Sequence, residues 1–261
     1  MKRTRITVDP QEFPAQLRPL LEGTAVYDSS CSPAARVYFI DREGGLFLKC
    51  AAKGTLEREA LMTGFFHEKG LGARVLVYES LDKDWLLTQR IPGEDCLHEA
   101  YLREPKRLCD VTAQLLRQLH ETDAAGCPVA DRTGEYLAQA RSNYEAGCFD
   151  KSLFPDNWGY ASAEEAWQVL EAGGKELKAD TLLHGDYCLP NIMLDDWRFS
   201  GFIDLDSGGV GDRHIDLFWG IWSLQFNLKT DAYRERFLDA YGREKVQPEL
   251  LRIVAAAEVF L

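Results

Sequence analysis

Two patterns of apolar spacing divide the chain. From about Thr24 to Ile91, short runs rich in β-branched and aromatic residues alternate with turn-forming or polar residues, which is typical of antiparallel strands. The strands are predicted at 24–28, 35–41, 45–50, 74–79 and 85–91. One helix interrupts them at 55–70, with Thr55 as its expected N-cap and Gly70 at its end. The first part is therefore predicted to be a small five-stranded antiparallel sheet with one helix.

After Pro105 the apolar spacing becomes helical. Four apolar residues follow one another at steps of three, four and four, on one face of the predicted helix: Leu108, Val111, Leu115 and Leu119. Further helices are predicted at 131–146, 162–172, 213–228, 231–241 and 248–260. Between them lies a β-rich region at about 181–205, with candidate strands at 182–185, 191–194 and 199–205.

These elements predict an α+β protein of two lobes. We place the first lobe at residues 1–91, a connector at 92–95, and a larger, mostly helical second lobe at 96–261. The length of 261 residues and a hydrophobic content of 46% are sufficient for a sizeable core. This composition excludes a disordered tail, a collagen-like fibre and a disulfide mini-protein.

The net charge of −12 makes a nucleic acid an unfavourable partner. The acidic residues are unevenly distributed. Residues 1–95 contain 13 basic and 14 acidic residues, and residues 96–261 contain 17 basic and 28 acidic residues. Solvated faces of acidic helices would explain this excess, and so would a cationic ligand.

The seven cysteines are scattered and form no Cys-x-x-Cys pair, which favours free thiols in a reducing compartment. The N-terminal segment MKRTRITVDPQEFP has no apolar run of signal-peptide length behind it, and no later segment approaches a membrane span. We expect a cytoplasmic protein without a membrane partner, and leave its oligomeric state open between a monomer and a weak dimer.

The candidate catalytic residues concentrate in the β-rich region. Asp186 and Asn191 are five positions apart in the loop HGDYCLPN, and Asp204 follows Asn191 by thirteen positions at the end of a strand. Mg²⁺ takes oxygen ligands and few protein carboxylates, so Asn191 and Asp204 are candidate metal ligands. The alternative for each residue is that it satisfies the backbone of a turn.

Asp186 would then remain available to accept a hydrogen bond from an attacking hydroxyl. Phosphoryl transfer requires an oriented nucleophile more than a strong base. The first lobe offers a complement, because Lys49 lies in a strand and Glu59 follows it by ten positions on the predicted helix. Such a pair would direct the ammonium group at nucleotide phosphates. A lysine that reaches solvent is the alternative for Lys49.

The segment HGDYCLPNIMLDDWRFSGFIDLDSGGVGDRHID resembles the catalytic and metal-binding region of aminoglycoside phosphotransferases, specifically their 3′-phosphotransferase branch. SPAARVYFI, LFLK and LERE also fall where that family has its nucleotide loop, strand lysine and helix glutamate. The resemblance extends through nearly the whole chain. It implies the two-lobed fold that this family shares with the protein kinases.

The resemblance also implies residue roles. Asp186 would be the catalytic base, Asn191 and Asp204 the Mg²⁺ ligands, and Lys49, steadied by Glu59, would bind the α- and β-phosphates of ATP or GTP. The remaining implied nucleotide contacts are Ser32 at the β-phosphate, Phe47 on the adenine, and the backbone of Gln89 and Ile91 at the base edge.

For the substrate, the resemblance implies acidic residues near the C-terminus and before the catalytic loop that bind sugar amines. Glu258 and Asp156 are the acidic candidates, and Phe260 is a further candidate for substrate binding. The chain departs from the family at Ala257, where an Asp is usual, and at Asp206-Ser207, where Gly-Arg is usual.

The predicted function is ATP- and Mg²⁺-dependent phosphorylation of the 3′ hydroxyl of a cationic aminoglycoside antibiotic. One alternative is the same chemistry on another alcohol, such as choline, an amino sugar or a different antibiotic. Another is a non-catalytic nucleotide-binding module, against which the set Lys49, Glu59, Asp186, Asn191 and Asp204 argues. A protein kinase is disfavoured because no activation segment large enough to bind a peptide is visible.

Overall fold

The computed structural model describes residues 3–150 and 159–261, and their contacts divide the chain into two compact units. The first unit comprises Met1–His98 and Met193–Asp206, and the second comprises Glu99–Ile192 and Ser207–Leu261. A segment distant in sequence thus packs with the N-terminal residues. The division into lobes at 1–91, 92–95 and 96–261 stays a prediction.

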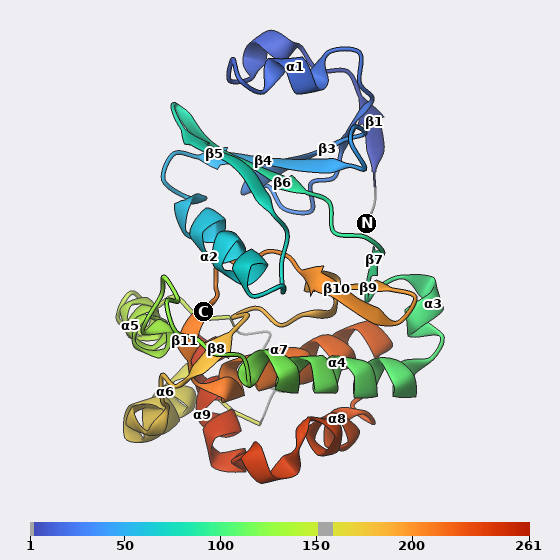
Figure 1. Ribbon diagram of the computed structural model, residues 1–261. Helices are drawn as coiled ribbons and strands as arrows, with labels where there is room; N and C mark the ends of the chain where they lie inside the picture. Colours follow the sequence, from blue (N-terminus) through green and yellow to red (C-terminus); the bar gives the residue numbers. More distant parts are fainter. Residues whose placement is uncertain (1–2, 151–158) are drawn as a thin grey trace. The chain divides into compact units, whose positions relative to one another are not determined.

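The first unit is built on an antiparallel sheet (Figure 1). Its strands follow the order β1-β2-β3-β4-β6-β5. Its strands are β1 (Thr4–Ile6), β2 (Val26–Asp28), β3 (Ala35–Ile40), β4 (Leu46–Ala52), β5 (Val75–Ser80) and β6 (Lys83–Gln89). All five predicted strands are confirmed, but the predicted count of five is wrong because β1 adds a sixth at the edge. Three residues of which only Ile6 is apolar carry too weak a pattern to be recognised before β2 is present to pair with them.

The helix α2 (Glu57–Glu68), predicted at 55–70, packs against β5 and is joined in this unit by the short η1 (Pro10–Glu12) and α1 (Arg18–Leu21). Its predicted N-cap is wrong. The Thr55 hydroxyl donates to the Ala52 carbonyl at 2.7 Å instead, and the Leu56 N–H at the helix start donates to the buried Asp84 carboxylate at 2.9 Å. A tertiary contact therefore replaces the local cap.

The predicted connector contains a strand, β7 (Glu94–Asp95), which pairs with β9 (Ile192–Asp195), and β9 pairs in turn with β10 (Arg198–Phe202). Gly93, just before β7, has φ 87°, and a Cβ there would lie 2.1 Å from the Leu194 carbonyl oxygen. Only glycine permits this close approach of the two backbones.

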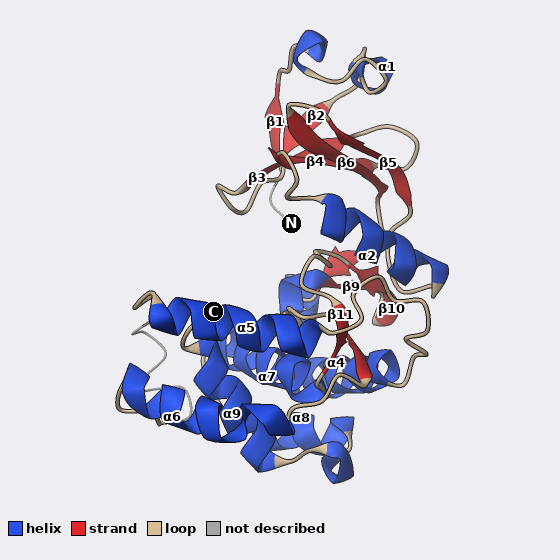
Figure 2. Cartoon of the chain, turned by 90° about the vertical axis from the view of Figure 1, so that its left-hand side faces the viewer, coloured by secondary structure: helices blue, strands red, loops and turns tan. Residues whose placement is uncertain are grey.

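The second unit is mostly helical, and its helices appear in blue in Figure 2. They are α3 (Glu99–Leu102), α4 (Pro105–His120), α5 (Arg132–Glu145), α6 (Ala163–Gly173), η3 (Gly174–Glu176), α7 (Arg213–Leu228), α8 (Arg234–Tyr241), η5 (Arg243–Lys245) and α9 (Pro248–Glu258). A two-stranded sheet of β8 (Thr181–Leu183) and β11 (Gly209–Gly211) accompanies them, and η4 (Leu189–Asn191) follows β8. None of the helices in the described part of the chain has both the length and the apolar character needed to cross a membrane.

Candidate active site

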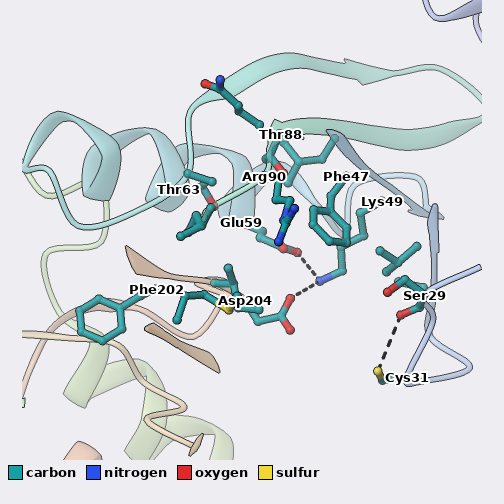
Figure 3. Close-up of a pocket in the computed structure, with 18 of the residues that line it drawn as sticks. Ser29, Cys31, Phe47, Lys49, Glu59, Thr63, Thr88, Arg90, Phe202 and Asp204 are labelled. Atoms are coloured by element: carbon teal, nitrogen blue, oxygen red, sulfur yellow. Dashed lines mark hydrogen bonds and ion pairs between the residues drawn. The ribbon is translucent and has the colours of Figure 1, made fainter. Parts of the chain in front are cut away.

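The first unit contains a cavity of about 190 Å³, shown in Figure 3. All the residues predicted from the sequence to bind the nucleotide line this cavity: Ser32, Phe47, Lys49, Glu59, Gln89 and Ile91. Asp204 lines it as well. They come from the loop before β3, from β4, from α2 and from the end of β6. The sheet register thus collects side chains that are up to 59 positions apart in sequence, from Ser32 to Ile91.

Lys49 forms the charged centre of this cavity. Its Nζ lies 2.8 Å from Glu59 Oε2 and 3.0 Å from Asp204 Oδ1, and Figure 3 shows the ammonium group between the two carboxylates. Burial opposes the charge of Lys49, but Asp204 and Glu59 outweigh that effect and raise its pKa. Lys49 is therefore a fixed positive charge in a partly enclosed site.

Glu59 is also buried, and the one cation bonded to it among the described residues is Lys49, which it shares with Asp204. Burial raises its pKa to about 7, although Lys49 lowers it, and the charges of Asp204 and Asp206 add to the rise. Asp206, at the position of the departure from the family pattern, is exposed. Its charge therefore remains solvated while it still acts on Glu59.

Asp204 follows β10 in the left-handed region, with φ 55°. Its side chain is 52% exposed, and only Oδ1 is occupied by Lys49. The second oxygen, Oδ2, has no hydrogen-bond partner among the described residues, so it offers the kind of hard oxygen that Mg²⁺ prefers.

The second unit contains the predicted catalytic loop between β8 and β9. Asn191 Nδ2 donates to the Asp186 carbonyl oxygen at 3.0 Å and to Asp186 Oδ2 at 2.8 Å. Both amide hydrogens of Asn191 are thereby directed at Asp186, which leaves Asn191 Oδ1 as an acceptor that fits a metal cation. The same bonds orient the Asp186 carboxylate.

The backbone of this loop is held by Asp216 on α7, a residue that the sequence analysis did not nominate. Asp216 is fully buried and accepts hydrogen bonds from the His184 N–H at 2.8 Å and the Gly185 N–H at 2.7 Å. His120 Nε2 lies 3.2 Å from the same carboxylate. Asp216 lies within the quoted motif, but no spacing rule links it to a loop about 30 positions earlier.

Two further contacts shape the loop. Gly185 has φ 84°, and a Cβ there would lie 1.8 Å from the Ser207 carbonyl oxygen, so glycine is required. The Asp186 N–H donates to His184 Nδ1 at 3.3 Å, so the His184 side chain helps to orient the loop.

The predicted substrate residues lie differently. Glu258 is 4% exposed, and its Oε1 accepts from the Tyr136 hydroxyl at 2.9 Å. Burial raises the pKa of Glu258 to about 7, although Tyr136 and Trp219 donate to it, and the charge of Asp186 adds to the rise.

Phe260 is 1% exposed and contacts the rings of Tyr144 and Trp167, with centroid distances of 5.5 and 5.9 Å. Its side chain is thus part of the core around α5 and α6. Asp156, the third candidate, lies outside the described residues.

Comparison with known proteins places this site in a family. The model of the phosphotransferase enzyme family APH matches residues 32–252. The chain belongs to this phosphotransferase family. The matched range contains the whole set from Ser32 to Asp204.

Individual relatives agree with this assignment. A probable aminoglycoside 3′-phosphotransferase of Lactococcus lactis is 48% identical to this phosphotransferase over 100% of the chain and 98% of the relative. The crystal structure of an aminoglycoside 3′-phosphotransferase of type VIII superposes with a TM-score of 0.75 at 27% identity, covering 94% of this chain and 97% of that one. An aminoglycoside phosphotransferase of Streptomyces rimosus, solved with ADP and streptomycin, shares the fold at a TM-score of 0.67 and 22% identity, covering 87% and 91%.

Proposed function

We propose that this phosphotransferase transfers the γ-phosphoryl group of ATP to the 3′ hydroxyl of an aminoglycoside. The observation that carries this proposal is the fixed Asp186 carboxylate, oriented by Asn191 in a loop that Asp216 anchors. The full-length similarity to the Lactococcus lactis enzyme supports the acceptor class.

The cavity of the first unit is proposed to bind the nucleotide, ATP or GTP. Lys49 has the fixed charge needed to bind the α- and β-phosphates, while Glu59 holds the ammonium in place. Phe47 offers an aromatic face to the purine. The Gln89 N–H already donates to the Arg74 carbonyl at 2.9 Å, so a contact of Gln89 with the base edge requires its carbonyl oxygen.

At the phosphates, Ser32 is the proposed contact of the β-phosphate. Its hydroxyl accepts from the Ala34 N–H at 3.1 Å, which fixes the turn before β3 and leaves the hydroxyl proton available to a phosphate oxygen. The proposed contact at Ile91 is its backbone, because its side chain is buried and faces Gly201.

Asn191 Oδ1 and Asp204 Oδ2 are the proposed protein ligands of Mg²⁺. Both are hard oxygen atoms, and a set of two suits a cation that keeps water and phosphate oxygens in its remaining positions. When bound, the ion would neutralise charge that develops on the phosphate oxygens.

Asp186 is proposed to act on the acceptor. The substrate hydroxyl donates to the Asp186 carboxylate, which orients the oxygen toward the γ-phosphorus; a bond forms between that oxygen and phosphorus while the bond to the β-phosphate oxygen breaks. The hydroxyl proton passes to Asp186, and ADP leaves. Asn191 holds the carboxylate in one orientation throughout.

The amino groups of the aminoglycoside would meet the acidic second half of the chain. Glu258, Asp156 and Phe260 remain the proposed contributors. Since the Glu258 carboxylate is buried against Tyr136, its proposed contribution is negative potential rather than an exposed contact. Because this chain has Ala257 where the family usually has an Asp, the negative potential at the substrate depends more on Glu258.

The test is an ATP-consumption screen with purified protein across kanamycin-type and neomycin-type aminoglycosides, choline and simple amino sugars. We expect Mg²⁺-dependent turnover with the aminoglycosides and identification of the 3′-phosphate by NMR. Activity only with choline or simple amino sugars would overturn the proposed acceptor.

The proposed role of Asp186 is tested with the variant Asp186→Ala. Removing the carboxylate is expected to lower kcat by at least about 100-fold, since general-base contributions are of this order, while the Kd of ATP changes little. Isothermal titration calorimetry gives the Kd. Normal turnover in this variant would exclude Asp186 as the base.

A further inference from the structure

The cavity of the first unit has an outer end that the proposed nucleotide contacts leave unused. Phe47 and Lys49 alternate with buried residues along β4, so their side chains lie on one face of the sheet. Phe39 of β3 lies opposite Phe47, and the two rings are 5.2 Å apart. Gly45 precedes Phe47 by two positions, and a Cβ there would lie 2.8 Å from the Phe39 ring and 3.0 Å from Arg90 Cδ. The outer end therefore lies where the Phe39 ring and Arg90 approach Gly45.

Arg3, which precedes β1, lies at this outer end. Its guanidinium carbon is 3.7 Å from the centroid of the Phe39 ring and 5.6 Å from that of Phe47, and Arg3 lines the cavity. A guanidinium over an aromatic ring is attracted through its face, while its N–H groups point outward in its own plane. The contact with Phe39 therefore positions Arg3 and leaves its donors available to a ligand.

At least one of these donors has no acceptor in the described part of the protein. The Nε atom of Arg3 is buried and has no hydrogen-bond partner among the described residues. Burial and the charge of Arg90 lower the pKa of Arg3, although the charges of Glu94 and Asp41 raise it. A buried donor without a partner is unfavourable, so it indicates a position where a bound ligand supplies the acceptor.

The backbone after β6 determines which edge of a purine would reach Arg3. The N–H groups of Gln89 and Arg90 already donate to carbonyl oxygens, at 2.9 and 3.0 Å. The Gln89 carbonyl oxygen and the Ile91 N–H are the proposed contacts of the base, and an acceptor followed by a donor matches the 6-amino group and N1 of adenine. The next ring atoms, C2 and N3, would then lie beyond Ile91. The charges of Arg90 and Glu94, on either side of Ile91 in sequence, both act on Arg3.

We propose that Arg3 selects the base of the nucleotide: its guanidinium donates to N3 of adenine and disfavours a purine that carries an amino group at C2, such as guanine. This inference rests on the proposed function and decides between ATP and GTP, which that function leaves open. The lone pair of N3 accepts a hydrogen bond, whereas a 2-amino group presents a further donor to a guanidinium that has only donors. Both donors would then lose hydration without gaining a partner.

The test measures the Kd of ATP and of 2-aminoadenosine triphosphate, which differs from ATP only by the amino group at C2. Isothermal titration calorimetry in the presence of Mg²⁺ gives both values. We expect the unmodified protein to bind ATP on the order of tenfold more tightly than the analogue. Arg3→Met keeps an unbranched side chain but removes its donors. We expect this variant to bind ATP several-fold more weakly and to prefer ATP over the analogue by no more than about twofold.

Arg5→Met is the matched control. Arg5 lies in β1, is exposed and does not line the cavity. We expect this variant to keep the preference of the unmodified protein. The preference is a ratio of two Kd values measured on one preparation, so a smaller folded fraction in a variant does not change it.

Three results would overturn the role of Arg3. They are an unchanged preference for ATP in Arg3→Met, the absence of a preference in the unmodified protein, and an equal loss of preference in Arg5→Met. Failure of the proposed function is distinguishable, because the calorimetry needs no acceptor. In that case the unmodified protein would bind neither nucleotide, or it would bind ATP and phosphorylate no aminoglycoside.

Discussion

Glu258 is a buried acid whose carboxylate has two hydrogen-bond donors, Tyr136 and Trp219, but no basic side chain bonded to it among the described residues. Burial raises its pKa from an ordinary value of 4.5 to about 7. A group whose pKa is raised on folding binds its proton more tightly in the folded protein. Its favourable contribution to folding is therefore complete below about pH 4.5 and is lost as the pH rises through about 7.

Glu258→Gln should remove this pH dependence, because glutamine resembles the protonated acid. We expect the melting temperature of the variant to exceed that of the unmodified protein at pH 8, by an amount equivalent to roughly 1–3 kcal/mol, and the difference to shrink at pH 5. Differential scanning calorimetry at both pH values measures it. A difference that does not change with pH would contradict the raised pKa.

At the scale of elements, Asp84 joins three parts of the first unit. It is the second residue of β6, and its Oδ2 accepts from the Leu56 N–H at the start of α2 and from the Tyr78 hydroxyl of β5. Burial would raise its pKa, but hydrogen bonds from Ser80 and from the backbone of Gly54 and Leu56 outweigh that effect and lower the pKa to about 2. The position of α2, and of Glu59 on it, thus depends on one carboxylate.

Asp84→Asn should weaken this junction, because the amide replaces an acceptor oxygen with a donor. We expect a loss of about 1–3 kcal/mol in the free energy of unfolding. The stabilisation by the Asp84 charge is present above about pH 3.8 and is lost as the pH falls through about 2. Urea titrations at pH 7 test the variant, and Asp82→Asn, in the exposed turn before β6, is the control. Equal stability of the two variants would contradict this role.

At the scale of the whole molecule, charge is distributed unevenly along the chain. The residues up to Asp95 contain nearly equal numbers of acids and bases, whereas 28 acidic and 17 basic residues follow. Long-range attraction of a cationic acceptor to such a surface is screened by salt, since the Debye length falls from about 10 Å at 0.1 M to about 3 Å at 1 M.

The KM of a polycationic aminoglycoside should therefore rise several-fold between 0.05 and 0.5 M NaCl. Steady-state assays at saturating ATP measure this change, and kcat at saturating acceptor serves as the internal reference because bound substrate no longer depends on capture. A KM that is independent of salt would show that the acidic excess only solvates the helices.

Local features of the sequence predicted most of the elements. The strands β2 to β6 and the helices α4 to α9 have apolar periods and turn or cap residues of their own, so their patterns are readable without their partners. The strands β1, β7 and β11 have two or three residues each and exist only because β2, β9 and β8 pair with them. Their formation depends on contacts between distant segments, which a local pattern does not contain.

The same distinction holds for the candidate site. The residue types and spacing of Asp186, Asn191 and Asp204, and the motif around them, pointed to phosphoryl transfer from the sequence by itself. Only the tertiary structure decided that Asp216 anchors the catalytic loop and that Glu258 is buried, because both depend on which distant side chains share one low-dielectric interior. The residue types determine which reaction a site can support. The burial and orientation of those residues depend on packing, which exists only in the folded chain.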